Sequence, residues 1–82
     1  MTSNTIEKKL LEVMEQNGIY ISDKWNEELD FDSITFISTI VGIEDIFGIE
    51  VPDEMLLLEN FKTFNQYVIN IKKILLNLNH PK

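Results

Sequence analysis

The chain has 82 residues and a formal net charge of −7 at pH 7. This length predicts one domain with a modest core, because so short a chain buries only about 60% of its unfolded surface. The acidic balance argues against a nucleic-acid binder, which needs a basic surface that faces phosphates. With no cysteine, disulfide bonds and thiolate metal sites are excluded. We find no secretory leader pattern and no apolar run of membrane-spanning length, so we expect a cytoplasmic protein without membrane insertion.

The first predicted helix begins near Asn4 and ends at Gly18. Asn4 is a good N-cap, Glu7 follows it three residues later, and glycine is a natural C-terminal cap. One face of this helix is mostly apolar, and its members are Ile6, Leu10, Val13, Met14 and Asn17. We expect this face to pack into the core.

Residues 19 to 32 form a long predicted loop with the apolar residues Ile19, Tyr20, Ile21 and Trp25. A loop of this length is unusual unless apolar residues fasten it to the core or the loop itself has a function. We interpret Trp25 as a lid over the core, and a contact with a partner protein is the alternative.

The second predicted helix runs from Ser33 to Phe47, and Gly48 ends it. At 100° per residue it carries two apolar stripes, the first made of Phe36, Ile40, Ile43 and Phe47 and the second of Ile34, Ile37 and Val41. Glu44 falls between the stripes, and Asp45 lies beside it. Two interpretations are open: one broad core face from which Glu44 reaches solvent, or a core face plus a separate exposed docking surface with an acidic rim.

The last third of the chain predicts a short helix and a long one. Pro52 in "GIEVPDE" fixes the entry to a short helical segment from Asp53 to Leu58. "TFNQ" is a capping box, in which Thr63 caps the last helix and Gln66 reaches back. The apolar stripe of that helix is Phe64, Tyr67, Val68, Ile71, Ile74, Leu75 and Leu78.

These elements predict an all-α fold of three main helices plus one short helix, because "IYIS" is the one strand-like segment left and has no partner strand. The whole chain, 1–82, is predicted to be a single domain with its core at about 5–78 and a short tail at 79–82.

Ser33 stands at the predicted start of the second helix, directly after Asp32. Free backbone N–H groups and the helix dipole favour an anion at such an end. Asp32 is the better N-cap, which leaves the Ser33 hydroxyl free to point outward and to carry a phosphate ester. The alternative is that Asp32 and Ser33 only start the helix.

Metal binding and catalysis are not supported by the sequence. Asp30 and Asp32 begin like a calcium loop, but Ile34 and Val41 occupy ligand positions and the required glycine is absent, so we predict no metal site. The only histidine, His80, lies in the tail, and no carboxylates pair in an acid–base arrangement. We also interpret Met55 and Leu56–Leu58 as packing residues rather than a binding site.

The segment "LDFDSI", residues 29–34, resembles the phosphopantetheine attachment motif of acyl carrier proteins, commonly Leu-Gly-x-Asp-Ser-Leu. "IEDIFGIEVPDE" at 43–54 and "FKTFNQYV" at 61–68 resemble the end of the second helix and the start of the last helix of that family. These blocks follow the family's order and spacing over about residues 5–76. The sequence departs from the motif at Asp30, where the family has glycine, and at Ile34, where it has leucine.

The resemblance implies a four-helix bundle of acyl-carrier type in which Ser33 carries a 4′-phosphopantetheine arm. A phosphopantetheinyl transferase would install the arm from coenzyme A, using magnesium. The thiol of the arm would hold acyl intermediates as thioesters, so the protein itself would be a carrier and not an enzyme.

The resemblance also assigns the two stripes of the second helix. The surface that partner enzymes recognise would be Ile34, Ile37 and Val41, with Glu44 and Asp45 on its rim. Candidate residues for an acyl cleft are Phe36, Ile40 and Ile43, which would equally make a core. The implied partners are a loading ligase for acyl or aminoacyl groups and downstream synthases or transferases.

Thr35 and Ser38 stand where carriers of primary fatty acid biosynthesis often have acidic residues. The second helix therefore offers fewer negative charges to basic partners than the helix of those carriers does. The segment "EMLLLENF" is longer than in those carriers and looks more like stand-alone carriers of one pathway. We therefore expect a monomeric carrier in a dedicated pathway, such as secondary metabolite biosynthesis, rather than in general fatty acid biosynthesis. The alternatives are a stand-alone aminoacyl or peptidyl carrier and an unmodified helical adaptor.

Overall fold

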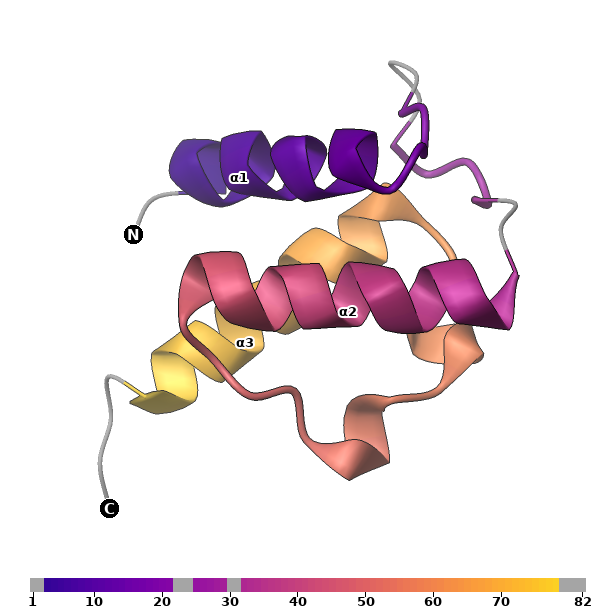
Figure 1. Cartoon of the computed structure of the whole chain (residues 1–82). Helices are drawn as coiled ribbons and strands as arrows, with labels where there is room; N and C mark the ends of the chain where they lie inside the picture. The colour runs from indigo at the N-terminus through magenta and orange to yellow at the C-terminus, as the bar shows by residue number, and fades with distance from the viewer. Residues whose placement is uncertain (1–2, 22–24, 30–31, 79–82) are drawn as a thin grey trace.

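We describe a computed structural model of the chain, in which residues 3–21, 25–29 and 32–78 are described. These ranges contain three α-helices, α1 (Ser3–Gln16), α2 (Ser33–Phe47) and α3 (Phe64–Leu78) (Figure 1). Over the described ranges the only β-type pairing is an isolated antiparallel bridge between Glu28 and Thr63. The all-α prediction is therefore confirmed. None of the helices in these ranges is long and apolar enough to cross a membrane.

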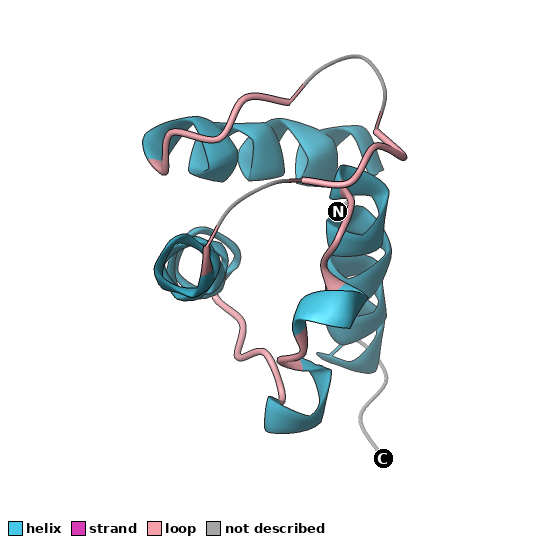
Figure 2. Cartoon of the chain, turned by 90° about the vertical axis from the view of Figure 1, so that its right-hand side faces the viewer, coloured by secondary structure: helices cyan, strands magenta, loops and turns pink. Residues whose placement is uncertain are grey.

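The three helices share one buried core. α1 contacts both α2 and α3, and Figure 2 shows it lying across the top of the other two, with α2 seen end-on. The core takes residues from every helix and from the connection between α2 and α3, namely Ile6, Leu10, Val13, Met14, Phe36, Ile40, Ile43, Phe47, Ile49, Val51, Phe61, Phe64, Tyr67, Val68, Ile71 and Ile74. The predicted apolar faces of the first and last helices are thus largely confirmed.

Local capping signals fix most helix ends. Gly18 and Gly48 have left-handed φ values of 73° and 64°, and the Gly48 N–H donates to the carbonyl of Glu44. Glycine suits both positions because a Cβ disfavours this conformation. At the other end of α1 the prediction needs correction: the helix begins at Ser3, so Asn4 lies inside it rather than before it. A difference of this size is common, because terminal turns are marginal.

The predicted short helix is replaced by two 3₁₀ turns, η1 (Asp53–Met55) and η2 (Leu58–Asn60). The Met55 N–H donates to the carbonyl of Pro52 at 2.9 Å, which is the tighter i→i+3 pattern of a 3₁₀ turn. Leu57 then adopts an extended conformation, with φ −119° and ψ 136°, so no helix continues through it. The count of four helices is therefore not confirmed.

The capping box of α3 is confirmed in both directions. The Gln66 N–H donates to Thr63 Oγ1 at 3.2 Å, and the Thr63 N–H donates to Gln66 Oε1 at 3.1 Å. The amide of Gln66 thus satisfies a backbone donor that the helix itself cannot satisfy.

The long loop before α2 is fastened to the core and to the start of α3. The Leu29 N–H donates to the carbonyl of Lys62, and the Asn65 N–H donates to the carbonyl of Trp25. The Trp25 ring meets the Phe64 ring edge-on at 4.8 Å between centroids, which confirms Trp25 as a lid over the core. Tyr20, which we grouped with the loop's apolar residues, instead points outward with 86% of its side chain exposed.

Within the described part of the chain, the core residue Tyr67 has a polar atom without a partner. Tyr67 is fully buried, and its ring lies 4.8 Å from that of Phe61. Its hydroxyl has no hydrogen-bond partner among the described residues, and burial raises the pKa of Tyr67. A buried hydroxyl without a partner costs stability, because it loses its bonds to water without replacement.

We therefore expect Tyr67→Phe to raise the free energy of unfolding by about 1 kcal/mol. The substitution keeps the ring in its place and removes only the unpaired hydroxyl. Urea denaturation of both proteins measures the difference. A loss of stability in the variant would show that the hydroxyl has a partner.

Candidate functional site

The start of α2 is fixed by Asp32. This residue has an extended backbone, with φ −83° and ψ 176°, and its Oδ1 accepts a hydrogen bond from the Thr35 N–H at 2.8 Å. Its carbonyl accepts the first helical bond, from the Phe36 N–H at 2.9 Å. Asp32 is therefore the N-cap, as the sequence predicts.

Because Asp32 caps the helix, Ser33 is left as an exposed residue at its tip. The structure records no hydrogen bond of the Ser33 hydroxyl to any described residue. The first N–H groups of an α-helix have no intrahelical acceptor, and the helix dipole adds positive potential at this end. Ser33 therefore combines an accessible hydroxyl with a setting that suits an anion, such as a phosphate ester.

The hydrogen bonds to Asp32 predict an effect of pH. Donation by the Thr35 backbone, and then by its side chain, lowers the pKa of Asp32 below its ordinary value. A depressed pKa means that the cap stabilises the fold fully above the unfolded value of about 3.9 and loses this contribution as the pH falls through the folded value. We expect Asp32→Asn, which keeps a capping oxygen, to flatten this acid limb of the stability profile. An unchanged limb, measured by urea denaturation from pH 2 to 7, would contradict the assignment.

The outer face of α2 carries an apolar surface, which we call the α2 surface: Ile34, Ile37 and Val41. Their exposed fractions are 80%, 53% and 57%. The opposite face is buried and consists of Phe36, Thr39, Ile40, Ile43 and Phe47. Of the two interpretations of this helix, a core face plus a separate exposed surface is therefore confirmed. The role of the α2 surface in binding partners stays a prediction.

The two acidic residues beside this surface differ in their surroundings. Glu44 is half-buried, and its Oε2 accepts a hydrogen bond from the Val51 N–H at 3.0 Å, which ties α2 to the chain that follows it. Asp45 is exposed. Asp45 is thus the more accessible of the two to a basic partner, whereas Glu44 stabilises the fold through its hydrogen bond to Val51.

The three candidates for an acyl cleft, Phe36, Ile40 and Ile43, lie in the core with 4%, 4% and 0% of their side chains exposed. The Phe36 ring packs against that of Phe61 at 5.7 Å between centroids. These residues are therefore part of the core in this structure, as the sequence also allowed. Their role as an acyl cleft stays a prediction.

Sequence reasoning missed two features of the site. Thr39 is a polar residue, but it is fully buried, and its Oγ1 donates to the carbonyl of Thr35 at 2.8 Å. This hydrogen bond satisfies the buried hydroxyl.

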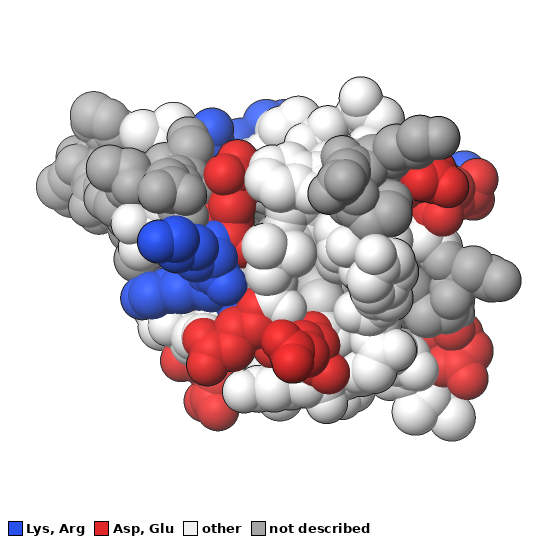
Figure 3. All heavy atoms as spheres, turned by 90° about the horizontal axis from the view of Figure 1, so that it is seen from above, with Lys and Arg blue, Asp and Glu red and all other residues white. Residues whose placement is uncertain are grey.

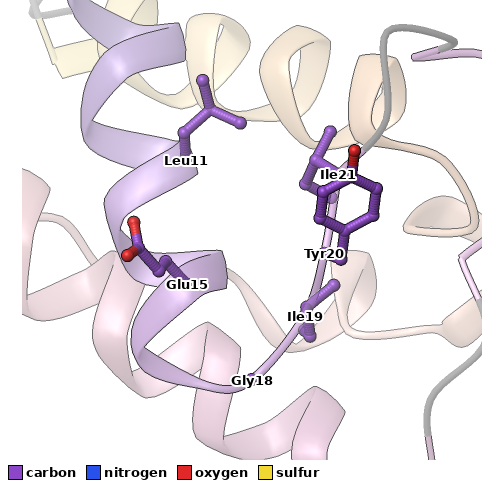
Figure 4. Close-up of a pocket in the computed structure, with 6 residues that line it drawn as sticks. All are labelled: Leu11, Glu15, Gly18, Ile19, Tyr20 and Ile21. Atoms are coloured by element: carbon purple, nitrogen blue, oxygen red, sulfur yellow. The ribbon is translucent and has the colours of Figure 1, made fainter.

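The second feature is a pocket of about 570 Å³ between α1 and residues 18–21. Its residues are Leu11, Glu15, Gly18, Ile19, Tyr20 and Ile21 (Figure 4). The path of a long loop decides such a pocket, and no local pattern predicts it.

The predictions for Asp30 and for His80 in the tail lie outside the described residues. Figure 3 looks down onto α1 and shows the acidic side chains of the described residues in separate groups, one of them beside basic side chains, with uncharged side chains between the groups.

Comparison with known proteins agrees with this geometry. Residues 5–69 match the family model described as "Phosphopantetheine attachment site". The match covers most of the chain and includes Asp32, Ser33 and the whole of α2. The chain therefore belongs to this family, that of the acyl carrier proteins.

The curated relatives that the chain matches are named acyl carrier protein. The chain is 34% identical over 51 residues to the acyl carrier protein of Arthrobacter sp. (strain FB24). These 51 residues cover 62% of this chain and 60% of that protein. It is 32% identical over 60 residues to that of Lactobacillus johnsonii (66% and 75%) and 39% identical over 44 residues to that of Myxococcus xanthus (54% and 53%). The chain thus spans between about half and three quarters of the length of these relatives. No solved structure gives a significant match.

Membership of this family settles two points. Its attachment site takes 4′-phosphopantetheine covalently, which confirms the predicted cofactor. Its members carry a bound group rather than catalyse a reaction, which confirms that the protein is not an enzyme.

Proposed function

We propose that the chain is a single carrier domain whose Ser33 bears the 4′-phosphopantetheine arm and that it presents acyl intermediates to partner enzymes. The observation that supports this most directly is the exposed Ser33 hydroxyl at the tip of α2, directly after the capping Asp32 and within the family match. When bound, the arm supplies a thiol that holds an acyl group as a thioester.

The residues around Ser33 fit such an arm. The carboxylate of Asp32 is occupied by the Thr35 N–H, so the cap does not compete for the Ser33 hydroxyl. The helix end favours the negative charge of a phosphodiester. The side chain of Ser33 faces solvent, which leaves a transferase free access to its Oγ.

Partner enzymes would meet the α2 surface, which begins at Ile34, next to the arm. Exposed apolar residues with a charge at their edge suit transient docking, and Asp45 supplies that charge. The partners we infer are a phosphopantetheinyl transferase, a loading ligase and downstream synthases or transferases. Uncharged Thr35 and Ser38 on the same helix support a dedicated biosynthetic pathway rather than general fatty acid synthesis.

The intact mass of the protein tests this proposal. After incubation with coenzyme A, magnesium and a broad-specificity phosphopantetheinyl transferase, the wild type should gain the mass of one arm, and Ser33→Ala should gain none. Ser38→Ala is the matched control, because it removes another exposed serine of α2 and should still gain the arm. A folded wild type that gains no mass would favour the unmodified helical adaptor.

A further inference from the structure

The outward side of α3 carries two apolar residues that the core does not use. Ile69 and Leu76 are 50% and 55% exposed. At about 100° per residue they lie about 145–165° around the helix from the middle of its buried stripe. That stripe consists of Phe64, Tyr67, Val68, Ile71 and Ile74. Half-exposed apolar residues are ordinary at the margin of a core, but these two lie opposite it.

Two lysines stand between the apolar pair along the helix. Lys72 and Lys73 follow Ile69 by three and four residues and precede Leu76 by four and three, so the four side chains share one face. We call these four residues the α3 surface. Lys73 is exposed and Lys72 is half-buried, and the structure records no ion pair of either lysine with another described residue.

The charge of the α3 surface is opposite to that of the chain as a whole. The chain has 14 acidic residues and 7 basic ones, yet α3 contains two lysines and no carboxylate side chain. Glu59 of η2 borders the beginning of the helix, where Gln66 Nε2 donates to the Glu59 carbonyl at 3.4 Å. Gln66 precedes Lys72 by a helix rise of about 9 Å, so the basic part of the surface is separated from this carboxylate.

Hydrogen bonds to neighbouring segments fix α3 in place. Asn70 Nδ2 donates to the carbonyl of Asn60 at 2.8 Å, which ties η2 to the helix, and the Asn65 N–H donates to the carbonyl of Trp25 at its first turn. The α3 surface is therefore a preformed helical face, and a partner would not have to order it on binding.

The α3 surface and the α2 surface point to different sides of the domain. Figure 2 shows α2 and α3 apart from each other beneath α1. Both helices turn their buried stripes toward the one core, so their outer faces point away from each other. A partner on the α3 surface would thus leave Ser33 and the α2 surface accessible.

We propose that the α3 surface is a second docking site, for a helix of a partner protein whose apolar residues are flanked by carboxylates. The apolar residues of that helix pack against Ile69 and Leu76, which are one heptad apart, and its carboxylates pair with Lys72 and Lys73. An anionic membrane would also attract the lysines, but the net charge of −7 opposes its approach. The inference goes beyond the proposed function, because it concerns a partner that holds the carrier while its arm stays free.

The test uses the whole unmodified chain and a synthetic helical peptide of about 20 residues, with leucine at a and d positions and glutamate at e and g positions. We expect this peptide to shift the amide NMR signals of Ile69, Lys72, Lys73 and Leu76 and to leave those of Ile34, Ile37 and Val41 unchanged. The same peptide with lysine in place of glutamate should bind at least tenfold more weakly. Binding of the glutamate peptide should weaken as salt is added.

Reversal of both charges in the double variant Lys72→Glu and Lys73→Glu should weaken the glutamate peptide at least tenfold and strengthen the lysine peptide. This gain shows that the variant is folded and that charge pairing is the cause. The matched control is the double variant Lys8→Glu and Lys62→Glu, which changes the net charge equally at exposed lysines outside the α3 surface and should bind the glutamate peptide more than the first variant does.

Four results would overturn the inference: no shifts with the glutamate peptide, shifts at the α2 surface instead, equal weakening in the two double variants, or binding of the α3 surface to phosphatidylserine vesicles but not to the peptide. None of them bears on the proposed function, because the peptide experiment needs no arm on Ser33.

Discussion

Phe64→Ala is expected to lower the free energy of unfolding by about 3–5 kcal/mol. Phe64 is fully buried at the first turn of α3 and contacts the Trp25 ring, so its loss leaves a cavity and also frees the lid. A small domain has only about 5–15 kcal/mol of total stability, so the variant should be close to unfolding. The midpoint of urea denaturation measures this loss.

Ile69→Ala is the matched control for this experiment. Ile69 lies on the same helix, but 50% of its side chain is exposed, so the change should cost less than about 1 kcal/mol. Similar losses for the two variants would show that Phe64 is not part of the core that the structure describes.

Ile37→Asp and Val41→Asp are expected to slow the installation of the arm by the transferase at least tenfold, equivalent to about 1.4 kcal/mol. Each places a charge in the middle of the α2 surface, where a partner would have to desolvate it. Both positions are more than half exposed, so folding should change little. The measurements are kcat/KM for arm installation and the urea midpoint of each variant.

Ile69→Asp is the control for these variants, because it places the same charge on an exposed apolar position of α3. It should leave arm installation unchanged. If all three variants slowed the transferase equally, the effect would be one of net charge, and the α2 surface would not be the docking site.

The helix ends that local chemistry decides were predictable from the sequence. Asp32 and Gly48 bound α2 as predicted, and Thr63 with Gln66 starts α3 as predicted. In each case a side chain or a left-handed glycine acts on backbone groups within four residues, so the signal lies within a short window of sequence.

The features that depend on tertiary contacts were not predictable. Thr39 is buried because the side of α2 that carries Gly42 meets α1 closely: a Cβ at Gly42 would lie 3.0 Å from Val13 Cγ1. Leu57 breaks the expected short helix into two turns, and Tyr20 points away from the core. Periodicity describes one element at a time and therefore cannot report which neighbour covers which side.

The candidate site shows the same division. The attachment motif and the exposed stripe of α2 could be predicted from residue identity and spacing, because both lie within one element. The half-buried Glu44 bonded to Val51 and the pocket of residues 11–21 could not be predicted, because each depends on the path of a loop.

The position of the arm is the most direct test of the account. Proteolysis of the modified protein followed by fragmentation mass spectrometry should place the whole added mass on Ser33. Among the other serines, Ser38 is the stringent comparison, because it also lies exposed on α2. An arm on any other residue, with Ser33 unmodified, would contradict the account.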